Sequence, residues 1–450
     1  MVREERPRKN QQHQINRDSR KSQGRERQKK QGRTTNKEFA RVTYFFVILF
    51  IALMGYLVYF SIVRAKLVVN SPYNQRQDAY AQSVIRGKLV DKNGNTLAET
   101  VVDEDGNESR NYPYGELFAH VIGYSNDKLG KTGLESVENF ELLTSNAFFI
   151  EKLKNEFSET KNMGDTVVTT LDADLQQAAY QALGENKGAV VVMEAATGKI
   201  LAMVSKPAYD PNNIVAAWSD LNSDDTNSPL LNRATQGSYA PGSTFKVVTA
   251  LSYIRQNASY RDYTYDCNGE ITEGDITIHC FGGHAHGQED LRSSFANSCN
   301  ASFANIGLQL DISQYKKTAE DMLFNKSLNT SKSSFALDSS SGSGEIMMTA
   351  MGQGKTTVSP YHMALIAEAV ANGGTVMQPY LVEYVTNYTG TQIRKNVPKS
   401  YKKVMTSDEA AQLKEYMSAV VEEGTGSVLR GRSYTVAGKT GTAEYSMSDG

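Results

Sequence analysis

The longest apolar stretch of the chain lies near its N-terminus. No charged residue occurs between Arg41 and Arg64, a run of 22 residues. In a helix such a run spans about 33 Å, enough for a bilayer core of roughly 30 Å. A cleaved signal peptide would have a shorter apolar region that ends in small residues. We therefore predict a transmembrane helix at residues 42–63.

Beyond this run, apolar and polar positions recur with strand or helix periodicity. The stretch 86–100 reads as two strands around an Asn-Gly turn, and 188–205 as two β-rich runs around a Thr-Gly turn. We further expect a short strand at 166–172, a helix at 173–183 that Asp172 caps, and a strand at 434–445. Strands near both ends with helices between them predict an α+β fold, an antiparallel sheet with helices on both faces.

A helical pattern of a different kind begins at Ser243. Apolar residues recur at helical spacing through Phe245, Val248 and Leu251. Because positions three apart share one face of a helix, Lys246 lies beside the Ser243 hydroxyl. A serine hydroxyl becomes a nucleophile when a neighbouring base takes its proton, and a lysine with a lowered pKa can be that base. Ser243 and Lys246 are therefore a candidate nucleophile and base.

Two further motifs lie downstream of this pair. The first is Ser298-Cys299-Asn300, and the second is Lys439-Thr440-Gly441-Thr442. Each pattern has chance matches, such as Ser-x-x-Lys at Ser313 and Lys-Thr-Gly at Lys131. Only one triplet keeps the order Ser-x-x-Lys, Ser-x-Asn, Lys-Thr-Gly with each motif in a plausible setting. Nearly this set is typical of serine β-lactamases and penicillin-binding proteins.

The amino-acid sequence around the motifs closely resembles that of one family. The stretches 188–212, 228–246 and 352–374 are similar to class B penicillin-binding proteins, most of all to the A-type monofunctional transpeptidases of cell elongation and division. The resemblance implies a penicillin-binding transpeptidase sandwich at 164–450. It also implies a small β-rich pedestal domain at 64–163, which holds the transpeptidase off the membrane and contacts partners.

The resemblance assigns catalytic roles to matching positions. Ser243 would attack the carbonyl of a D-Ala–D-Ala stem peptide, and neutral Lys246 would accept its proton. Ser298 would relay that proton to the leaving amine. Asn300 would hold Lys246 and the substrate amide in place. Lys439 would lower the pKa of Lys246 by its positive charge.

Substrate binding is assigned to the last motif. Lys439 would attract the terminal carboxylate of the substrate, and the hydroxyls of the segment Thr440-Gly441-Thr442 would bind it. Backbone N–H groups of Ser243 and Thr442 would form the oxyanion hole.

A member of this family would be a peptidoglycan D,D-transpeptidase that cross-links stem peptides and is acylated by β-lactams. Its partners would be peptidoglycan stem peptides, β-lactam antibiotics and a lipid II-polymerising glycosyltransferase of the SEDS type, and it would need no cofactor. A β-lactamase-like protein and an inactive division scaffold stay open as alternatives. A nucleotide-binding protein is excluded, because the glycine that a P-loop needs is missing before every Gly-Lys-Thr.

Charge is distributed unevenly along the chain. Residues 1–41 hold 14 Lys and Arg against 5 Asp and Glu, a net charge of +9, and since the whole chain carries −2 the remainder carries −11. This basic segment has almost nothing apolar, so we expect a disordered tail. Beside a transmembrane helix it favours a cytoplasmic tail over nucleic-acid binding, with everything after Arg64 outside the bacterial plasma membrane.

The chain has three cysteines, Cys267, Cys280 and Cys299. Because Cys299 lies inside the second motif, Cys267–Cys280 is the disulfide to consider. Zinc is conceivable because three histidines fall within 279–286, but the spacing matches no standard ligand pattern. We expect a surface loop with free thiols or one disulfide, no metal, and His286 as a loop contact.

The last expectation concerns the C-terminus. Eight residues follow Thr442, whereas the family that the chain resembles continues for several dozen residues. We therefore expect a truncated product in which the 434–445 strand is an exposed, unpaired edge.

Overall fold

The computed structural model describes residues 37–64, 83–146, 155, 158, 160–328 and 333–443. By its internal contacts the chain forms two units, Met1–Asn74 and Gln75–Gly450. In the first unit a helix covers Lys37–Tyr59 and has a mean hydropathy of 2.2. It continues as a π-helical turn, η1, at Phe60–Arg64. By length and composition this helix fits a single-pass membrane protein.

The helix begins earlier than its apolar pattern. We predicted 42–63, but residues 37–41, which we had placed in the disordered tail, are already helical. Helix propensity explains the extension, because Lys, Glu, Ala and Arg are good helix formers. The rest of the predicted tail, residues 1–36, lies outside the described residues.

The second unit contains a sheet of six strands in the order β17-β16-β8-β2-β3-β4. These strands are β2 (Leu89–Val90), β3 (Thr96–Val102), β4 (Glu108–Asn111), β8 (Thr166–Thr169), β16 (Val382–Thr386) and β17 (Gln392–Lys395). The predicted hairpin at 86–100 is confirmed as antiparallel β2 and β3, and the predicted strand at 166–172 as β8. Only the β2–β8 pair within this sheet is parallel.

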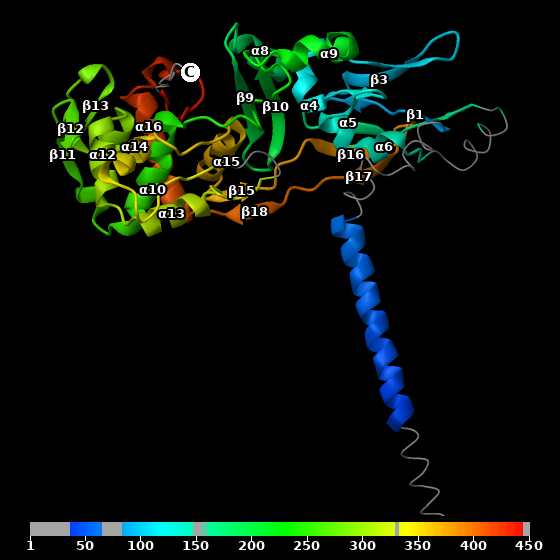
Figure 1. Cartoon of the computed structure of the whole chain (residues 1–450), viewed down its shortest axis with the longest axis horizontal. Coiled ribbons are helices and arrows are strands. Elements are labelled where there is room, and N and C mark those ends of the chain that lie inside the picture. The colour runs from blue at the N-terminus through cyan, green and yellow to red at the C-terminus, as the bar shows by residue number, and fades with distance from the viewer. Residues whose placement is uncertain are drawn as a thin grey trace, which may run out of the picture. The chain divides into compact units, whose positions relative to one another are not determined.

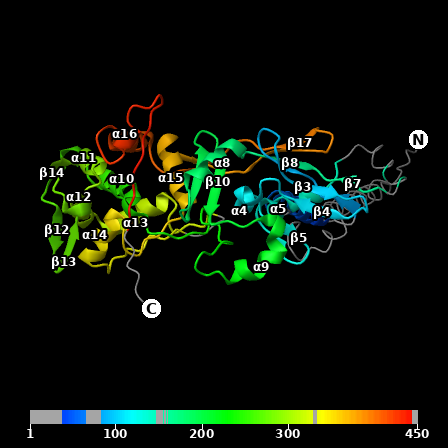
Figure 2. The same cartoon turned by 90° about the horizontal axis from the view of Figure 1, so that it is seen from above.

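This sheet crosses the boundary that we expected after residue 163. Strand β8 pairs with β2 on one side and with β16 on the other, and in Figure 2 the orange β17 lies at the same end of the unit as β8 and the cyan β3. The pedestal and transpeptidase segments, divided after residue 163, thus share one sheet. Short elements surround it: β1 (Val84–Ile85), η2 (Gly115–Phe118), α4 (Ala119–Ile122), β5 (Ser125–Asn126), β6 (Gly130–Lys131), α5 (Gly133–Val137), α6 (Asn139–Leu143) and β7 (Asn162–Met163).

A buried ion cluster holds these elements to the sheet. Glu135 of α5 is fully buried, and its carboxylate accepts hydrogen bonds from Arg86 at 2.7 Å and from Arg110 of β4 at 2.7 Å. Two guanidinium groups therefore face one carboxylate in a low-dielectric site, where losing the carboxylate would leave both charges uncompensated.

A long hairpin follows, as predicted for 188–205. Its strands are β9 (Gly188–Glu194) and β10 (Lys199–Lys206), which pair antiparallel. The preceding helix α8 (Ala173–Ala182) is capped by Asp172, whose side chain accepts a hydrogen bond from the backbone N–H of Leu175. Helix α8 packs on β10, and α15 (Pro360–Ala371) packs on β9. After the hairpin come η3 (Pro211–Asn213) and α9 (Ile214–Ser223).

The remaining helices form a bundle that carries the candidate motifs. In Figure 1, α10, α12, α14 and α16 lie together, and they pack on one another. The elements here are η4 (Gly242–Phe245), α10 (Lys246–Gln256), η5 (Tyr260–Asp262), α11 (Leu291–Ala296), α12 (Asn300–Gln309), α13 (Ile312–Asp321), α14 (Ser343–Met351), α16 (Ser407–Glu422) and η7 (Ser427–Leu429). Short strand pairs flank them: β11 (Thr264–Cys267) with β14 (Gly287–Asp290), β12 (Glu270–Glu273) with β13 (Ile276–His279), and β15 (Thr375–Met377) with β18 (Ser400–Lys403). The turn η6 (Phe281–Gly283) follows β13.

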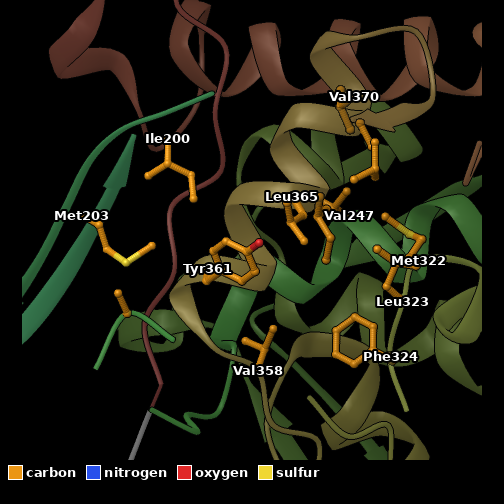
Figure 3. Close-up of a cluster of buried hydrophobic side chains, with 14 of the residues drawn as sticks. Ile200, Met203, Val247, Met322, Leu323, Phe324, Val358, Tyr361, Leu365 and Val370 are labelled. Carbon is orange, nitrogen blue, oxygen red and sulfur yellow. The ribbon is translucent and has the colours of Figure 1, made fainter. Parts of the chain in front are cut away.

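The core of the bundle fixes the position of α10. Phe245 is fully buried and meets Phe324 edge to face, with ring centroids 5.4 Å apart. Figure 3 shows Val247 of α10 facing Leu365 of α15, within a cluster that includes Phe324 and Tyr361. A helix held on this many apolar contacts is a rigid support for side chains at its N-terminal end.

The predicted strand at 434–445 is wrong for the residues that the structure describes. Residues 434–443 have no strand assignment, and the backbone N–H of Gly438 donates to the carbonyl of Met417 in α16 at 3.0 Å. The β-like pattern of this stretch needs a neighbouring strand to become a strand, and here its backbone meets a helix instead.

Candidate active site

Ser243 and Lys246 lie on one continuous helical turn. The predicted helix is confirmed, but its first turn is the 3₁₀ segment η4, and Lys246 is the first residue of α10. Ser243 is half-buried, whereas Lys246 is fully buried. A substrate can thus approach the hydroxyl from solvent while the amine stays shielded from water.

The Lys246 amine is held by the second motif. Its Nζ donates hydrogen bonds to the Ser298 carbonyl at 2.6 Å and to Asn300 Oδ1 at 2.8 Å, and it lies 3.3 Å from Ser298 Oγ. Burial, and then the positive charge of Lys439, hold the pKa of Lys246 well below its ordinary value. A buried lysine next to a second cation favours the neutral amine, which is the form that a general base requires.

Ser298 occupies a strained turn between α11 and α12. Its φ of 57° is left-handed, a conformation that few residues other than glycine adopt. Cys299 then caps α12, its Sγ accepting from the N–H of Ser302. Asn300 opens the helix and also donates from Nδ2 to the carbonyl of His279 at 3.1 Å. The turn therefore directs Ser298 and Asn300 toward the same amine.

Lys439 reaches the site from the third motif. Its Nζ donates to Ser298 Oγ at 2.8 Å and to the carbonyl of Thr440 at 3.1 Å. Desolvation lowers the pKa of Lys439 to about 8. Both lysine amines thus contact one serine hydroxyl, which can pass a proton between groups on either side of it.

The segment after Lys439 lies against the turn that holds Ser243. A Cβ added to Gly242 would lie 2.5 Å from the carbonyl oxygen of Thr442, and one added to Gly441 would lie 2.8 Å from Thr244 Cγ2. The Thr440 hydroxyl is hydrogen-bonded to the hydroxyl of Thr425 at 2.6 Å. Backbone from two distant motifs therefore meets at the start of η4.

Sequence reasoning missed two contributors to this meeting point. Gly352 accepts a hydrogen bond from the Gly242 N–H at 2.8 Å, and a Cβ on Gly352 would lie 1.7 Å from the Gly242 carbonyl oxygen. Its φ of 93° also favours glycine. A glycine after the helical pattern of α14 was the available signal, whereas nothing in the sequence pointed to Thr425.

The structure thus brings most of the predicted site residues together. Direct hydrogen bonds join four of them: Lys246, Ser298, Asn300 and Lys439. Gly441 and Thr442 lie beside the nucleophile turn through their backbones. The side chain of Thr440 is engaged with Thr425.

Comparison with known proteins agrees with this geometry. Residues 188–450 match the penicillin-binding protein transpeptidase domain, and residues 86–167 match the penicillin-binding protein A dimerisation domain. The peptidoglycan D,D-transpeptidase PbpA of Mycolicibacterium smegmatis is 33% identical over 405 residues, which are 83% of this chain and 80% of that protein.

Solved structures show the same similarity in three dimensions. The D,D-transpeptidase domain of a peptidoglycan glycosyltransferase from Eggerthella lenta is 31% identical with a TM-score of 0.73, covering 81% of this chain and 88% of that one. Penicillin-binding protein A from M. tuberculosis, solved as a penicillin G acyl-enzyme complex, is 30% identical with a TM-score of 0.69, covering 76% and 83%. Sequence, fold and motif geometry lead to one conclusion: the chain belongs to the penicillin-binding transpeptidase family and is of its class B type.

Proposed function

We propose that the protein is a peptidoglycan D,D-transpeptidase that cross-links stem peptides through an acyl-enzyme on Ser243 and is acylated by β-lactams at the same residue. The observation that carries the proposal is the convergence of Lys246 and Lys439 on the hydroxyl of Ser298. Two buried lysine amines that contact one neutral hydroxyl would serve little purpose in a structural role. This arrangement fits a site that has to move a proton.

Acylation begins with activation of the nucleophile. Neutral Lys246 takes the proton of the Ser243 hydroxyl as its oxygen attacks the carbonyl carbon of the penultimate D-alanine. Hydrogen bonds from Lys246 to Ser298 and Asn300 keep the amine in place during this transfer. The low pKa of Lys246 supplies the neutral form without a further base.

The proton then has to reach the leaving amine. Ser298 Oγ lies 3.3 Å from Lys246 Nζ and 2.8 Å from Lys439 Nζ, so it is the available relay. When the peptide bond breaks, the terminal D-alanine leaves with that proton, and the acyl group stays on Ser243. A stem-peptide amine from a second strand then attacks the acyl-enzyme and forms the cross-link.

Binding of the substrate carboxylate falls to the last motif. Lys439 supplies the positive charge, and the hydroxyls of Thr440 and Thr442 supply hydrogen bonds. The backbone N–H groups of Ser243 and Thr442 form the oxyanion hole, which the close approach of Gly242 to Thr442 supports. Losing one such donor costs roughly 100- to 1000-fold in rate.

The cellular setting follows from the chain's organisation. We propose a cytoplasmic tail at 1–41, a membrane anchor at 42–63, a pedestal at 64–163 and a transpeptidase at 164–450 in the periplasmic or extracellular space. A lipid II-polymerising glycosyltransferase of the SEDS type is the proposed partner in the membrane. Protease added to intact protoplasts should remove everything beyond Arg64 and leave the tail protected.

Labelling of membranes with a fluorescent penicillin tests the function. Ser243→Ala should abolish the label, and mass spectrometry of the wild type should show one adduct on the peptide that contains Ser243. Ser313→Ala is the matched control, because Ser313 heads another Ser-x-x-Lys match, on α13, and it should keep the label. Label that persists in Ser243→Ala would refute the assignment. Release of the label within seconds would favour the β-lactamase alternative. Absence of label on the wild type would favour the inactive scaffold.

A further inference from the structure

Four side chains with metal-binding atoms meet next to the active site. They are Cys267 at the end of β11, Cys280 after β13, His286 just before β14, and Cys299 at the N-cap of α12. One ligand atom from each lies within 4.8 Å of all the others. All three cysteines are buried, and His286 is half-buried.

The spacing of these atoms does not fit a disulfide. The sulfur–sulfur distances are 3.6 Å for Cys267–Cys280, 3.7 Å for Cys280–Cys299 and 3.4 Å for Cys267–Cys299, whereas a disulfide bond is about 2.05 Å long. All three thiols are free. Of the two alternatives expected from the sequence, free thiols are therefore confirmed and a disulfide is not, although the three side chains are buried and face one another.

The same distances fit a tetrahedron around one metal ion. Zinc bound by thiolates at about 2.3 Å and by imidazole at about 2.0–2.1 Å places sulfurs about 3.8 Å apart and a sulfur about 3.5 Å from the nitrogen. Here the sulfurs are 3.4–3.7 Å apart, and His286 Nδ1 lies 3.4 Å from Cys267 Sγ. We propose that Cys267, Cys280, His286 and Cys299 form a Zn²⁺ site, contrary to the absence of a metal that the sequence suggested.

The ligand set specifies what such a metal does. Four protein ligands leave no open position for water or substrate, so the site is structural rather than catalytic. Thiolates and imidazole select zinc over the hard cations Mg²⁺ and Ca²⁺. Binding requires the three thiols to lose their protons, and the metal then ties β11, the 280–286 segment and α12 together.

One of the four proposed zinc ligands belongs to an active-site motif. Cys299 lies between Ser298 and Asn300, the two residues that hold the Lys246 amine. Asn300 is bonded to the carbonyl of His279, next to Cys280. The metal would therefore fix the strained turn at Ser298, a positioning role that rests on the proposed function.

Metal analysis of the full chain tests the site itself. Protein purified in detergent with a reductant and without chelators should contain about one zinc per chain. His286→Ala should lose zinc to a chromophoric chelator at a concentration at which the wild type keeps it. His284→Ala is the matched control: the residue is exposed on the same loop, outside the cluster, and the variant should keep its zinc.

A second measurement does not depend on any variant. Cobalt added to the metal-stripped wild type should produce the thiolate-to-cobalt charge-transfer band and the intense visible bands of a tetrahedral site, and should protect all three thiols from a thiol reagent. Absence of zinc in the purified protein together with an octahedral cobalt spectrum would overturn the proposal. Equal zinc retention by His286→Ala and His284→Ala would remove His286 from the ligand set.

The positioning role has its own readout. Stripping the zinc should slow penicillin acylation at least about tenfold, and adding zinc back should restore it. Ser243→Ala should keep its zinc and lose acylation, so failure of the metal proposal and failure of the proposed function are distinguishable. Unchanged acylation in stripped protein would overturn the positioning role and leave the binding site standing.

Discussion

Two substitutions separate the effect of the Ser298 hydroxyl on the acylation rate from the effect of its backbone conformation on stability. Ser298→Ala removes the hydroxyl that both lysines contact and keeps a Cβ at a φ of 57°. Ser298→Gly removes the same hydroxyl and also the Cβ that makes this conformation unfavourable. Both variants leave Lys246 bonded to the carbonyl of residue 298 and to Asn300.

The two variants should be equally slow but unequally stable. Loss of a proton relay costs about 100- to 10,000-fold in rate, so both should react with penicillin slower by that factor. A residue with a Cβ in the left-handed conformation destabilises the folded state by roughly 1–2 kcal/mol. Glycine avoids this cost, but its greater chain entropy in the unfolded state offsets roughly 0.5–1 kcal/mol of the gain. Ser298→Gly should therefore be more stable than Ser298→Ala by about 0.5–1 kcal/mol.

Stopped-flow or gel-based labelling with a fluorescent penicillin gives the acylation rate constant, and urea unfolding gives the free energy of unfolding. Acylation of Ser298→Gly within about tenfold of the wild type would refute the relay, because the hydroxyl would then be dispensable. Lower stability of Ser298→Gly than of Ser298→Ala would refute the strain argument.

Three further predictions follow from other contacts. Lys246→Arg should fold but lose nearly all acylation, because a guanidinium does not deprotonate; a rate within about threefold of the wild type would mean that another group takes the proton. Lys439→Met should move the rise of acylation rate with pH to higher pH. The reason is that the positive charge of Lys439, whose own pKa is about 8, helps to keep Lys246 neutral. An unchanged pH profile would show that this charge does not affect the pKa of Lys246. Glu135→Gln should destabilise the protein by about 3–5 kcal/mol in urea unfolding, because two buried guanidinium groups lose their counter-charge. The control Glu99→Gln breaks the partly exposed pair with Lys88 and should cost about 0–1 kcal/mol. Equal losses of stability would contradict the role given to burial.

Local patterns in the sequence were sufficient wherever local chemistry decides the structure. The cap at Asp172, the Asn-Gly hairpin and the helix after Ser243 depend on residues within a few positions of one another. The motif order then identified residues that meet in the site, among them Lys439 and Ser298, which are 141 positions apart. Their assignment to one site came from the resemblance, and their direct contact came from the structure.

Features that depend on distant partners were not predictable in this way. Residues 434–443 have a strand-like pattern, but in the structure their backbone meets α16. The close approach of Gly352 to Gly242 joins segments about 110 residues apart, and a glycine at the end of a helix does not indicate which distant segment it contacts. The proposed metal site was considered and set aside from the sequence, because its four ligands lie at the end of β11, after β13, before β14 and at a helix cap, with irregular spacing along the chain.

The shared six-stranded sheet sets an order of events during synthesis of the protein. Strand β8 is complete at Thr169, but its neighbour β16 begins only at Val382, about 210 residues later. At 5–20 residues per second, ribosomes need on the order of ten to forty seconds to make the intervening chain. During that time β8 has one open edge able to pair with a foreign strand. The pedestal sheet is therefore among the last parts of the protein to close, although most of its residues are made first, and a fragment that ends before Val382 keeps the open edge of β8 permanently.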